Sequence, residues 1–179
     1  MSHTPLVRTV EEPGRAEGIV AAQEVPGRLP AVRVSAGSDH AGFELKGLLI
    51  GHLRSLGHEV ADLGTHSADP VDYPDFAAAV GRSVTSGEAD LGICTCGTGT
   101  GMAIAANKIL GVRAAVVHDV TSARLARAHD NANVICIGAR LVGPLIATEA
   151  LEAFLGSEFE GGRHLRRVEK VTALEQHRA

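Results

Sequence analysis

The chain has 179 residues, of which 45% are apolar and only 3% aromatic, and its formal net charge is −4. This length fits one well-filled domain, and a core that must be built from Ala, Val, Leu and Ile favours the α/β class. The slightly acidic balance argues against nucleic acid as the main partner, because binding to a phosphate backbone normally requires a basic surface.

Residues 1–30 differ in composition from the rest of the chain. They contain four of the seven prolines and show no sustained hydrophobic period, so we interpret them as a flexible N-terminal extension. This segment lacks the basic-then-apolar layout of a signal peptide, and no run in the chain approaches ~18 apolar residues. Three cysteines, an odd number, do not suggest a disulfide framework. We therefore expect a cytoplasmic protein without membrane contact.

Residues 31–179 are interpreted as a single domain in which strand-like and helix-like segments alternate. Strands are predicted at 32–36, 59–63, 91–96, 113–117 and 134–138. Helices are predicted at 43–56, 73–86, 102–110, 121–129, 144–155 and 163–176. Such βα repetition predicts a five-stranded parallel sheet with helices on both faces, an α/β/α arrangement. The order of the strands in the sheet is not readable from the sequence.

The turn after the third predicted strand is rich in glycine. It reads Gly97, Thr98, Gly99, Thr100 and Gly101. Alternate glycines allow positive φ angles and expose backbone N–H groups, and a following helix N-terminus adds unpaired donors, so the turn is predicted to bind an anion. Neither NAD nor ATP is the favoured ligand, because Met102 replaces the third glycine of the dinucleotide fingerprint and no Gly-Lys-Ser/Thr follows.

Cys96 ends the third strand and stands directly before this loop. Open α/β sheets bind their ligands at the carboxyl ends of strands, and a helix N-terminus favours a thiolate. These two features favour a reactive Cys96 over the alternative of a small buried hydrophobic residue like Cys94. A redox pair of Cys94 and Cys96 is disfavoured, because alternate residues of a strand lie too far apart for an undistorted disulfide.

Several strand ends contribute polar side chains to the edge of the sheet that carries the Cys96 loop, because right-handed crossovers place all strand-to-helix loops there. The set comprises Ser38, Asp39 and His40 after the first strand, His118 and Asp119 after the fourth, and Arg140 after the fifth. Structural roles remain open: Asp39 and Asp119 could cap helices, and His40 could be a satisfied loop histidine. For Asp119 we prefer the capping role.

Three side chains in the last third of the chain are further candidates. His129 closes the predicted helix 121–129, where a histidine often serves only as a partner of the helix dipole. Arg163 and Arg167 are four residues apart and are predicted to share one face of the helix 163–176, where they could bind one phosphate. Without further information, a solvated basic face would be the preferred interpretation of the two arginines.

Five motifs, in order, resemble one known family closely. They are SDHAGFELK at 38–46, DYP at 72–74, CGTGTGMAIAANK at 96–108, His129 followed by ANV at 132–134, and EGGRH at 160–164. Together they cover about residues 32–176 and resemble the type B ribose-5-phosphate isomerases, which group with the subunits of galactose-6-phosphate isomerase. The resemblance implies a three-layer Rossmann-like α/β/α sandwich, an assembly of at least two subunits, and no metal or organic cofactor.

The resemblance also implies an activity, the interconversion of ribose 5-phosphate and ribulose 5-phosphate through an enediolate. Cys96 matches the base that moves a proton between C1 and C2 of the sugar. Asp39 and His129 match the residues that open the sugar ring, with His129 as the proton donor. Residues 97–101 match the loop that holds the enediolate oxygens, assisted by Thr98. This chemistry agrees with the residues, because an isomerase needs a base tuned towards neutral pH and donors aimed at the developing oxyanion.

The same resemblance implies how the site is assembled. Arg163 and Arg167 match phosphate ligands from a neighbouring subunit, while Cys96, Asp39 and His129 are expected to come from one chain. The other substrate-binding candidates are Ser38, His40, Gly97, Gly99, Thr100, Gly101, Asp130 and Arg140. We therefore expect a homodimer, or a dimer of dimers, with shared active sites.

Asp130 departs from the family pattern, which commonly has Asn after the catalytic histidine. The identity of the sugar therefore stays open, and allose 6-phosphate, galactose 6-phosphate or a tetrose phosphate are alternatives. One carbon more or less changes binding by only ~1–3 kcal/mol. A non-catalytic module that binds phosphosugars is a further alternative, but it would not need Cys96, Asp39 and His129 together.

Overall fold

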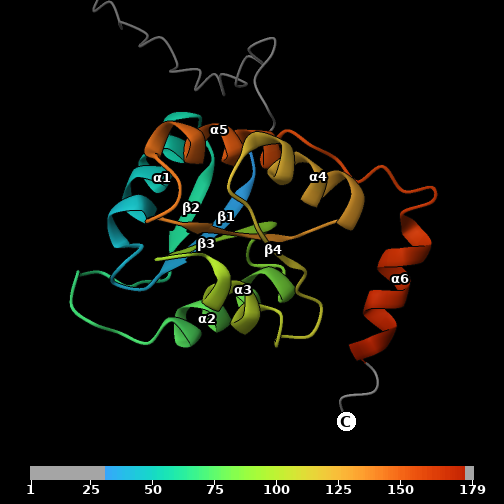
Figure 1. The fold of residues 1–179 in the computed structure, drawn as a ribbon, viewed down its shortest axis with the longest axis horizontal. Helices are drawn as coiled ribbons and strands as arrows, with labels where there is room; N and C mark the ends of the chain where they lie inside the picture. Colours follow the sequence, from blue (N-terminus) through green and yellow to red (C-terminus); the bar gives the residue numbers. More distant parts are fainter. Residues whose placement is uncertain (1–30, 176–179) are drawn as a thin grey trace, which may run out of the picture.

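The structure is a computed structural model that describes residues 31–175. The strands of its sheet are β1 (Arg33–Ser38), β2 (Glu59–Asp62), β3 (Leu91–Cys96), β4 (Ala114–Val116) and β5 (Val134–Gly138). The helices are α1 (Phe43–Ser55), α2 (Tyr73–Thr85), α3 (Thr100–Ala106), α4 (Val120–Asp130), α5 (Pro144–Leu155) and α6 (Leu165–Ala173). Helices cover both faces of the parallel sheet, so the expected three-layer sandwich is confirmed (Figure 1). The segment 1–30, expected to be a flexible extension, lies outside the described residues.

The strands are arranged in the order β2-β1-β3-β5-β4. From β1 the chain continues to β2 on one side of the sheet, whereas from β3 it continues to β4 on the other side. The chain connections that follow the neighbouring strands β1 and β3 therefore diverge, which makes their carboxyl ends the topological switch point of the sheet. Open α/β sheets bind their ligands at such a switch point.

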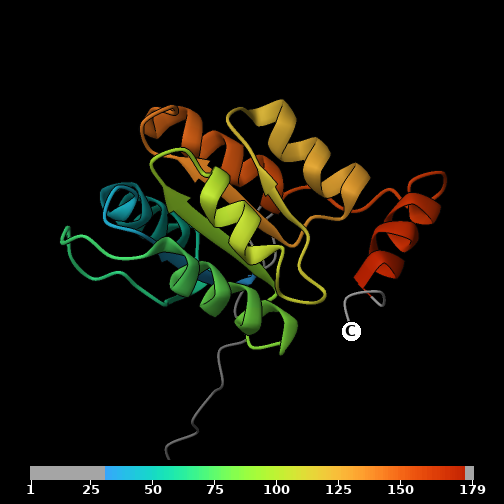
Figure 2. The same ribbon diagram turned by 60° about the horizontal axis from the view of Figure 1, so that its bottom comes forward.

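Two apolar clusters lie on the two faces of the sheet. Figures 1 and 2 show the helices that cover these faces. Helices α1, α4 and α5 cover one face, where Ile93, Ile135 and Ile137 pack with Leu49 and Phe154. Helices α2 and α3 cover the other face, whose cluster contains Val80, Met102, Cys94, Cys96 and Cys136. Successive residues of a strand point to opposite faces, so all three cysteines lie on the α2/α3 side.

Helix α2 packs unusually close to the sheet at Val80. A methyl group added at Gly92 would lie 2.6 Å from Val80 Cγ1, and one added at Gly37 would lie 2.8 Å from Val80 Cγ2. Gly37 and Gly92 belong to the adjacent strands β1 and β3. The two glycines therefore form a seat for the Val80 side chain that no larger residue could provide.

Most elements agree with the sequence-based prediction within two residues, but α3 and α6 differ more. Helix α3 was expected at 102–110 and instead spans Thr100–Ala106. It stops there because the Asn107 side chain pairs with the backbone of Ala114, accepting from its N–H and donating to its carbonyl, both at 2.8 Å. Among residues 31–175, no helix is long and apolar enough to cross a membrane.

Helix α6 stands apart from the three layers, beyond the end of α4 (Figures 1 and 2). None of its residues is buried, and Leu165 and Val171 are about half exposed. Its far end is tethered by Glu175, whose carboxylate accepts a hydrogen bond from the N–H of Gly111 at 3.1 Å. The helix therefore presents apolar side chains that nothing in the described chain covers.

Candidate active site

Cys96 lies at the carboxyl end of β3 and is 5% exposed. Its Sγ accepts a hydrogen bond from the N–H of Gly99 at 3.1 Å. Gly99 has a φ angle of 77°, and a methyl group there would lie 2.9 Å from the carbonyl oxygen of Cys136. Only glycine fits this position. The loop therefore bends around the sulfur with a backbone N–H directed at it, an arrangement that suits a thiolate or another anion.

The other two cysteines are free and fully buried in the core beside Cys96. A hydrogen bond with Cys94, together with burial, raises the pKa of Cys136 well above its usual range. Cys136 therefore stays protonated and is no candidate for a base. Of the three thiols, only Cys96 stands at a loop that a ligand can reach.

Two side chains flank the mouth of the loop. A methyl group at Gly97 would lie 3.5 Å from Cδ of Arg140, and one at Gly101 would lie 3.0 Å from the ring of Tyr73. The guanidinium of Arg140 thus approaches the beginning of the loop, as expected, and the Tyr73 ring covers its end. Tyr73 was not among the predicted site residues, although the DYP motif that contains it was noticed.

The end of β4 contributes a histidine and a helix cap to the same edge. His118 Nε2 lies 3.4 Å from the carbonyl oxygen of Thr98, which can only accept, so the imidazole carries a proton on Nε2. Asp119 Oδ1 accepts the N–H of Ser122 at 2.8 Å, and this bond lowers the pKa of Asp119. Asp119 and Ser122 form a capping box at the start of α4, so the capping interpretation of Asp119 is confirmed.

Asp39 and His40 follow β1 next to the Cys96 loop. The N–H of Asp39 donates to the carbonyl oxygen of Thr95 at 3.3 Å, and its carboxylate accepts the N–H of Gly42 at 2.9 Å. Asp39 is therefore held one strand away from Cys96, with one carboxylate oxygen in a local turn. His40 Nδ1 accepts the N–H of Val71 at 3.3 Å, which leaves the proton of its neutral ring on Nε2.

Ser38, another substrate-binding candidate, faces a different layer. Its neighbours Val34 and Ala36, at alternate positions of β1, belong to the cluster under α1 and α5. Its hydroxyl is buried and has no hydrogen-bond partner among residues 31–175. The alternation along β1 thus puts the Ser38 side chain and the Cys96 thiol on opposite faces of the sheet.

A buried lysine braces the end of β1. Lys46 is only 1% exposed, and its Nζ donates to the carbonyl oxygen of Thr65 at 2.8 Å and to the carboxylate of Asp62. The N–H of Thr65 in turn donates to the carbonyl oxygen of Ser38 at 2.9 Å. Lys46 therefore anchors the loop that supports the residue directly before Asp39. The sequence analysis missed this role.

Replacing Lys46 by Met keeps most of the side-chain volume and should lower the free energy of unfolding by about 1–3 kcal/mol, because buried acceptors lose their donor. Partial burial raises the pKa of Asp62, but hydrogen bonds from Lys46 and Gly64 and the charge of Lys46 outweigh it, so the net effect lowers the pKa. Because the pKa of Asp62 is lowered, its ion pair with Lys46 stabilises the fold at pH values above 3.8, the ordinary pKa of a carboxyl group, and this contribution is lost as the pH falls further. The difference in the free energy of unfolding between wild type and Lys46→Met, measured by urea unfolding, should therefore become smaller below pH 3.8.

The exposed Lys108 provides the control for this prediction. Lys108→Met should change the free energy of unfolding by less than about 0.5 kcal/mol, as surface substitutions usually do. A Lys46→Met protein as stable as wild type at neutral pH would contradict the anchoring role.

His129 lies at the opposite edge of the sheet from Cys96. In β3, Cys96 pairs with Gly138 at the carboxyl end, whereas Gly92 at the other end donates its N–H to the carbonyl oxygen of Asn133 at 2.9 Å. The four residue steps from 92 to 96 span about 13 Å. His129 comes four residues before Asn133, in the last turn of α4, and therefore shares the amino edge of the sheet.

The expectation that one chain brings His129 to Cys96 and Asp39 is therefore wrong. In a βαβ unit the helix runs antiparallel to its strands, so only its N-terminus lies at their carboxyl ends. The C-terminal histidine of α4 is carried to the far edge by the length of the helix. If His129 acts together with Cys96, it must do so across two chains.

A compact group of side chains surrounds His129. Its ring stacks on His164 with 4.1 Å between the ring centroids and 15° between the planes. Glu160 Oε2 lies 3.6 Å from His129 Nε2 and 3.9 Å from His164 Nε2. Arg163 Nε donates to His164 Nε2 at 3.2 Å. Burial, followed by the positive charges of His129 and Arg163, lowers the pKa of His164.

The two arginines predicted to share a helix face do not do so. Helix α6 begins at Leu165, because Gly161 and Gly162 have positive φ angles and form a turn, and the first helical carbonyl is that of His164. Arg163 lies in this turn and Arg167 in the first turn of the helix. Their positions relative to each other are thus set by the glycine turn rather than by helical spacing.

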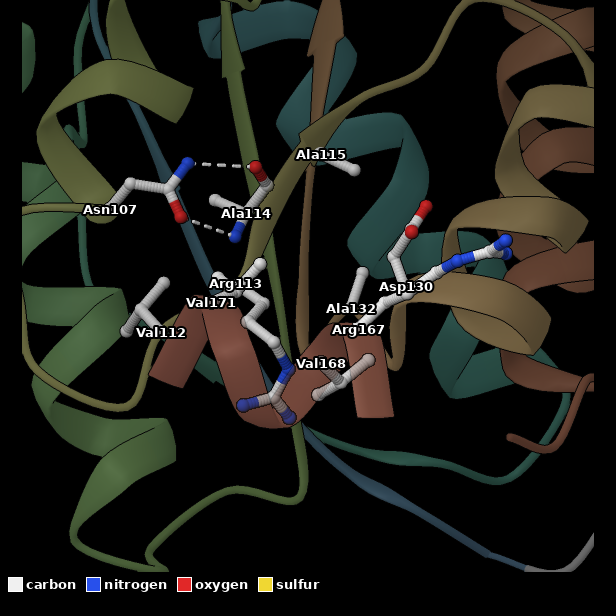
Figure 3. A pocket seen from close by; sticks show the side chains of 10 residues that line it. All are labelled: Asn107, Val112, Arg113, Ala114, Ala115, Asp130, Ala132, Arg167, Val168 and Val171. Carbon is white, nitrogen blue, oxygen red and sulfur yellow. Dashed lines mark hydrogen bonds between the residues drawn. The ribbon is translucent and has the colours of Figure 1, made fainter. Parts of the chain in front are cut away.

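Arg167 and Asp130 line a cavity between α6, β4 and the end of α4 (Figure 3). The cavity measures about 320 Å³, and its other lining side chains include Arg113, Val168 and Val171. Burial lowers the pKa of Arg113, whose Nε donates to the carbonyl oxygen of Asn131 at 2.8 Å. The cavity lies at the amino edge of the sheet and does not include Cys96.

His129, Glu160 and His164 offer the ligand types of a metal site, with their ligand atoms within 4.8 Å of one another. Two features work against a cation there. The nitrogen of His164 that faces Glu160 already accepts a hydrogen bond from Arg163. The two rings are nearly parallel, so their nitrogen lone pairs do not converge on one point. The three side chains are therefore arranged as a carboxylate beside two stacked imidazoles and not as the ligands of a metal ion.

Residues 34–171 match the sequence model of the family described as Ribose/Galactose Isomerase. The chain belongs to this family. Ribose-5-phosphate isomerase B of Escherichia coli is 47% identical over 146 residues, which cover 82% of this chain and 98% of the relative. D-erythrulose-4-phosphate isomerase of Pectobacterium atrosepticum is 42% identical over 142 residues, covering 77% and 91%. The crystal structure of Mycoplasma genitalium ribose-5-phosphate isomerase B with bound ribulose-5-phosphate is 43% identical, has a TM-score of 0.77 and covers 80% and 96%.

Membership of the Ribose/Galactose Isomerase family confirms the resemblance inferred from the five motifs. The matched range contains both groups of residues, the Cys96 edge and the surroundings of His129 with the first turns of α6. The two groups are separate in one chain, although both carry residue types that an isomerase uses.

Proposed function

We propose that this protein is an aldose–ketose isomerase that interconverts ribose 5-phosphate and ribulose 5-phosphate. The observation that carries the proposal is the Cys96 thiol, held by the N–H of Gly99 at the mouth of a loop rich in backbone donors. Family membership and the 47% identity to a ribose-5-phosphate isomerase B support it. A reducing cytoplasm suits an enzyme whose base is a free thiol, and a cytoplasmic location is part of the proposal.

In the proposed reaction the Cys96 thiolate removes the proton from C2 of the open-chain aldose and returns it to C1. The electrons of the C–H bond form the enediolate, whose negative charge is stabilised by N–H groups of residues 97–101 and by Thr98. As the proton returns to C1, the hydroxyl proton of O2 passes to O1, which leaves the C2 ketone. Before this step Asp39 and His129 open the furanose ring. Arg140 and His40, at the same edge as Cys96, bind the hydroxyl groups of the sugar.

The proposal includes a homodimer, alone or within a dimer of dimers, whose active sites are shared. Cys96 and Asp39 of one subunit act with His129, Arg163 and Arg167 of the other, and the two arginines bind the phosphate with charge-assisted hydrogen bonds. Two observations support a second copy as the missing partner. His129 and Cys96 of one chain lie at opposite edges of the sheet, which are separated by about 13 Å of strand. Helix α6 also exposes apolar side chains, with Leu165 at 48% and Val171 at 52%.

A panel of sugar phosphates tests the function. Ribose 5-phosphate, allose 6-phosphate, galactose 6-phosphate and erythrose 4-phosphate would be assayed for ketose formation with and without a chelator. Ribose 5-phosphate should have the highest kcat/KM, and the chelator should have no effect, because the proposed proton transfers use side chains only. Absence of turnover on every sugar, despite measurable binding, would instead identify a phosphosugar-binding module.

Asp130 is proposed to influence which sugar is preferred. It is exposed at the end of α4 and lines the cavity with Arg167, so its carboxylate lies on the subunit face that carries the phosphate ligands. A carboxylate repels phosphate but accepts hydrogen bonds from hydroxyl groups. Asp130→Asn should therefore change the ranking of the panel by several-fold in kcat/KM. An unchanged ranking would show that Asp130 does not set specificity.

A further inference from the structure

Glu160 and His164 enclose His129 on two sides. We propose that both are positioning residues for the ring-opening step: His164 holds the plane of the His129 ring, and Glu160 holds the proton on its Nε2. The inference rests on the proposed function, because it assigns roles around the histidine that opens the sugar ring.

His164, one of the two stacked imidazoles, is held in its neutral form. His164 is 6% exposed and its Nε2 accepts the N–H of Arg163, so the proton of the neutral ring is on Nδ1. Burial and the neighbouring positive charges lower its pKa, so His164 stays neutral at neutral pH. A neutral ring can stack on a histidine that gains and loses a proton without repelling its charged form.

Glu160 defines the orientation of the His129 ring. Its Nε2 is the nitrogen nearest to Glu160, at 3.6 Å from Oε2. Glu160 is fixed to the last turn of α4, because its N–H donates to the carbonyl oxygen of Ala128 at 3.0 Å. With the carboxylate on the Nε2 side, Nδ1 of His129 is left for the sugar. Within residues 31–175, no hydrogen bond involves this Nδ1.

In the ring-opening step, His129 starts as an imidazolium with protons on both nitrogens. It gives the proton from Nδ1 to the ring oxygen O4 of the furanose as the C1–O4 bond breaks, and it is left neutral with its remaining proton on Nε2. The hydroxyl on C1 loses its proton to the carboxylate of Asp39 from the other subunit, and a C1 aldehyde forms. Glu160 compensates the charge of the imidazolium before the transfer and faces the remaining Nε2–H afterwards, without changing its own protonation, and no oxidant or reductant is involved.

The test compares a substrate that has a ring with reactions that need none. Erythrose 4-phosphate cannot form a furanose because its O4 is phosphorylated, and ribulose 5-phosphate is likewise open-chain. Glu160→Gln should lower kcat/KM for ribose 5-phosphate by about tenfold or more, but by less than the whole contribution of a general acid, which is ~10²–10⁴. It should change erythrose 4-phosphate turnover, and deuterium uptake at C1 of ribulose 5-phosphate in D₂O, by less than about twofold. A purely structural role would lower all three rates together.

Matched variants make the outcome specific. Glu158→Gln changes an exposed carboxylate on the same connection and should leave all rates unchanged. His164→Phe keeps a flat ring and should retain more of the ribose 5-phosphate activity than His164→Ala. Equal loss in the ring and open-chain reactions, or no loss with Glu160→Gln, would overturn the proposal. A wild-type enzyme inactive on ribose 5-phosphate would instead count against the proposed function.

Discussion

Replacing Cys96 by Ala should lower kcat on ribose 5-phosphate by at least about a hundredfold, because the variant lacks the group that moves the proton. Binding of the sugar phosphate, measured by calorimetry, should change little, since the loop N–H groups and the arginines do not depend on the thiol. The hydrogen bond from Gly99 to the sulfur would be lost, but the loop is also held by its close packing on Cys136. A variant that kept more than a tenth of wild-type turnover would show that Cys96 is not the base.

Cys94 and Cys136 provide matched controls, because they are buried on the same face of the sheet. Cys94→Ala and Cys136→Ala should lower stability through lost packing and leave the kcat of the folded protein within about twofold. The raised pKa of Cys136 supports this expectation, because a protonated thiol cannot accept a proton. A collapse of kcat in a folded Cys94→Ala protein would bring back a role for a pair of thiols.

Mixing a Cys96→Ala chain with a His129→Ala chain should restore about a quarter of wild-type activity. Each variant alone is expected to be inactive. In a mixed dimer with shared sites, one site lacks both groups and the other has both. Equal amounts mixed at random give half mixed dimers, each with one intact site out of two. The measurement is ribose 5-phosphate turnover after the chains have exchanged, with exchange followed by native mass spectrometry.

The mixture of Cys96→Ala with Asp39→Asn is the control. Both residues lie at the carboxyl edge of the same sheet, so no mixed dimer has an intact site and activity should stay at background. Arg163→Ala/Arg167→Ala should complement Cys96→Ala in the same way as His129→Ala does. The shared arrangement would be wrong if the subunits exchange and Cys96→Ala gains no activity with either His129→Ala or Arg163→Ala/Arg167→Ala. Each chain would then have to complete its own site.

Much of the fold was predictable because its signals are local. The strands Leu91–Cys96 and Val134–Gly138 and the helix Pro144–Leu155 were predicted with their observed ends. Each is a short apolar run or an amphipathic period bounded by glycine, proline or a charged residue. The strand order was not predictable, because it depends on which strands pair across long stretches of chain.

The candidate site was predictable only in part. The loop at 97–101 has a local pattern, whereas the placement of His129 follows from the antiparallel course of helices in a βαβ unit rather than from any local pattern. Lys46 lies in the apolar stripe of α1, at helical spacing from Leu49, Ile50 and Leu53, which is an unusual place for a lysine. Its partners, however, lie in a loop whose position no local pattern predicts.

The seat of Val80 on Gly37 and Gly92 connects the core to the loop that follows Cys96. Val80 and Tyr73 are seven residues apart, two turns along one face of α2, and the Tyr73 ring lies on Gly101. The depth at which the core accepts Val80 therefore sets how far the tyrosine reaches over the loop. Alanine can raise heat resistance at a glycine whose backbone and surroundings it fits, since it restricts the unfolded chain, but it lowers stability where it clashes. At Gly37 or Gly92 the added methyl group would push α2 outward and lift Tyr73 from the loop, so the replacement should lower both stability and turnover.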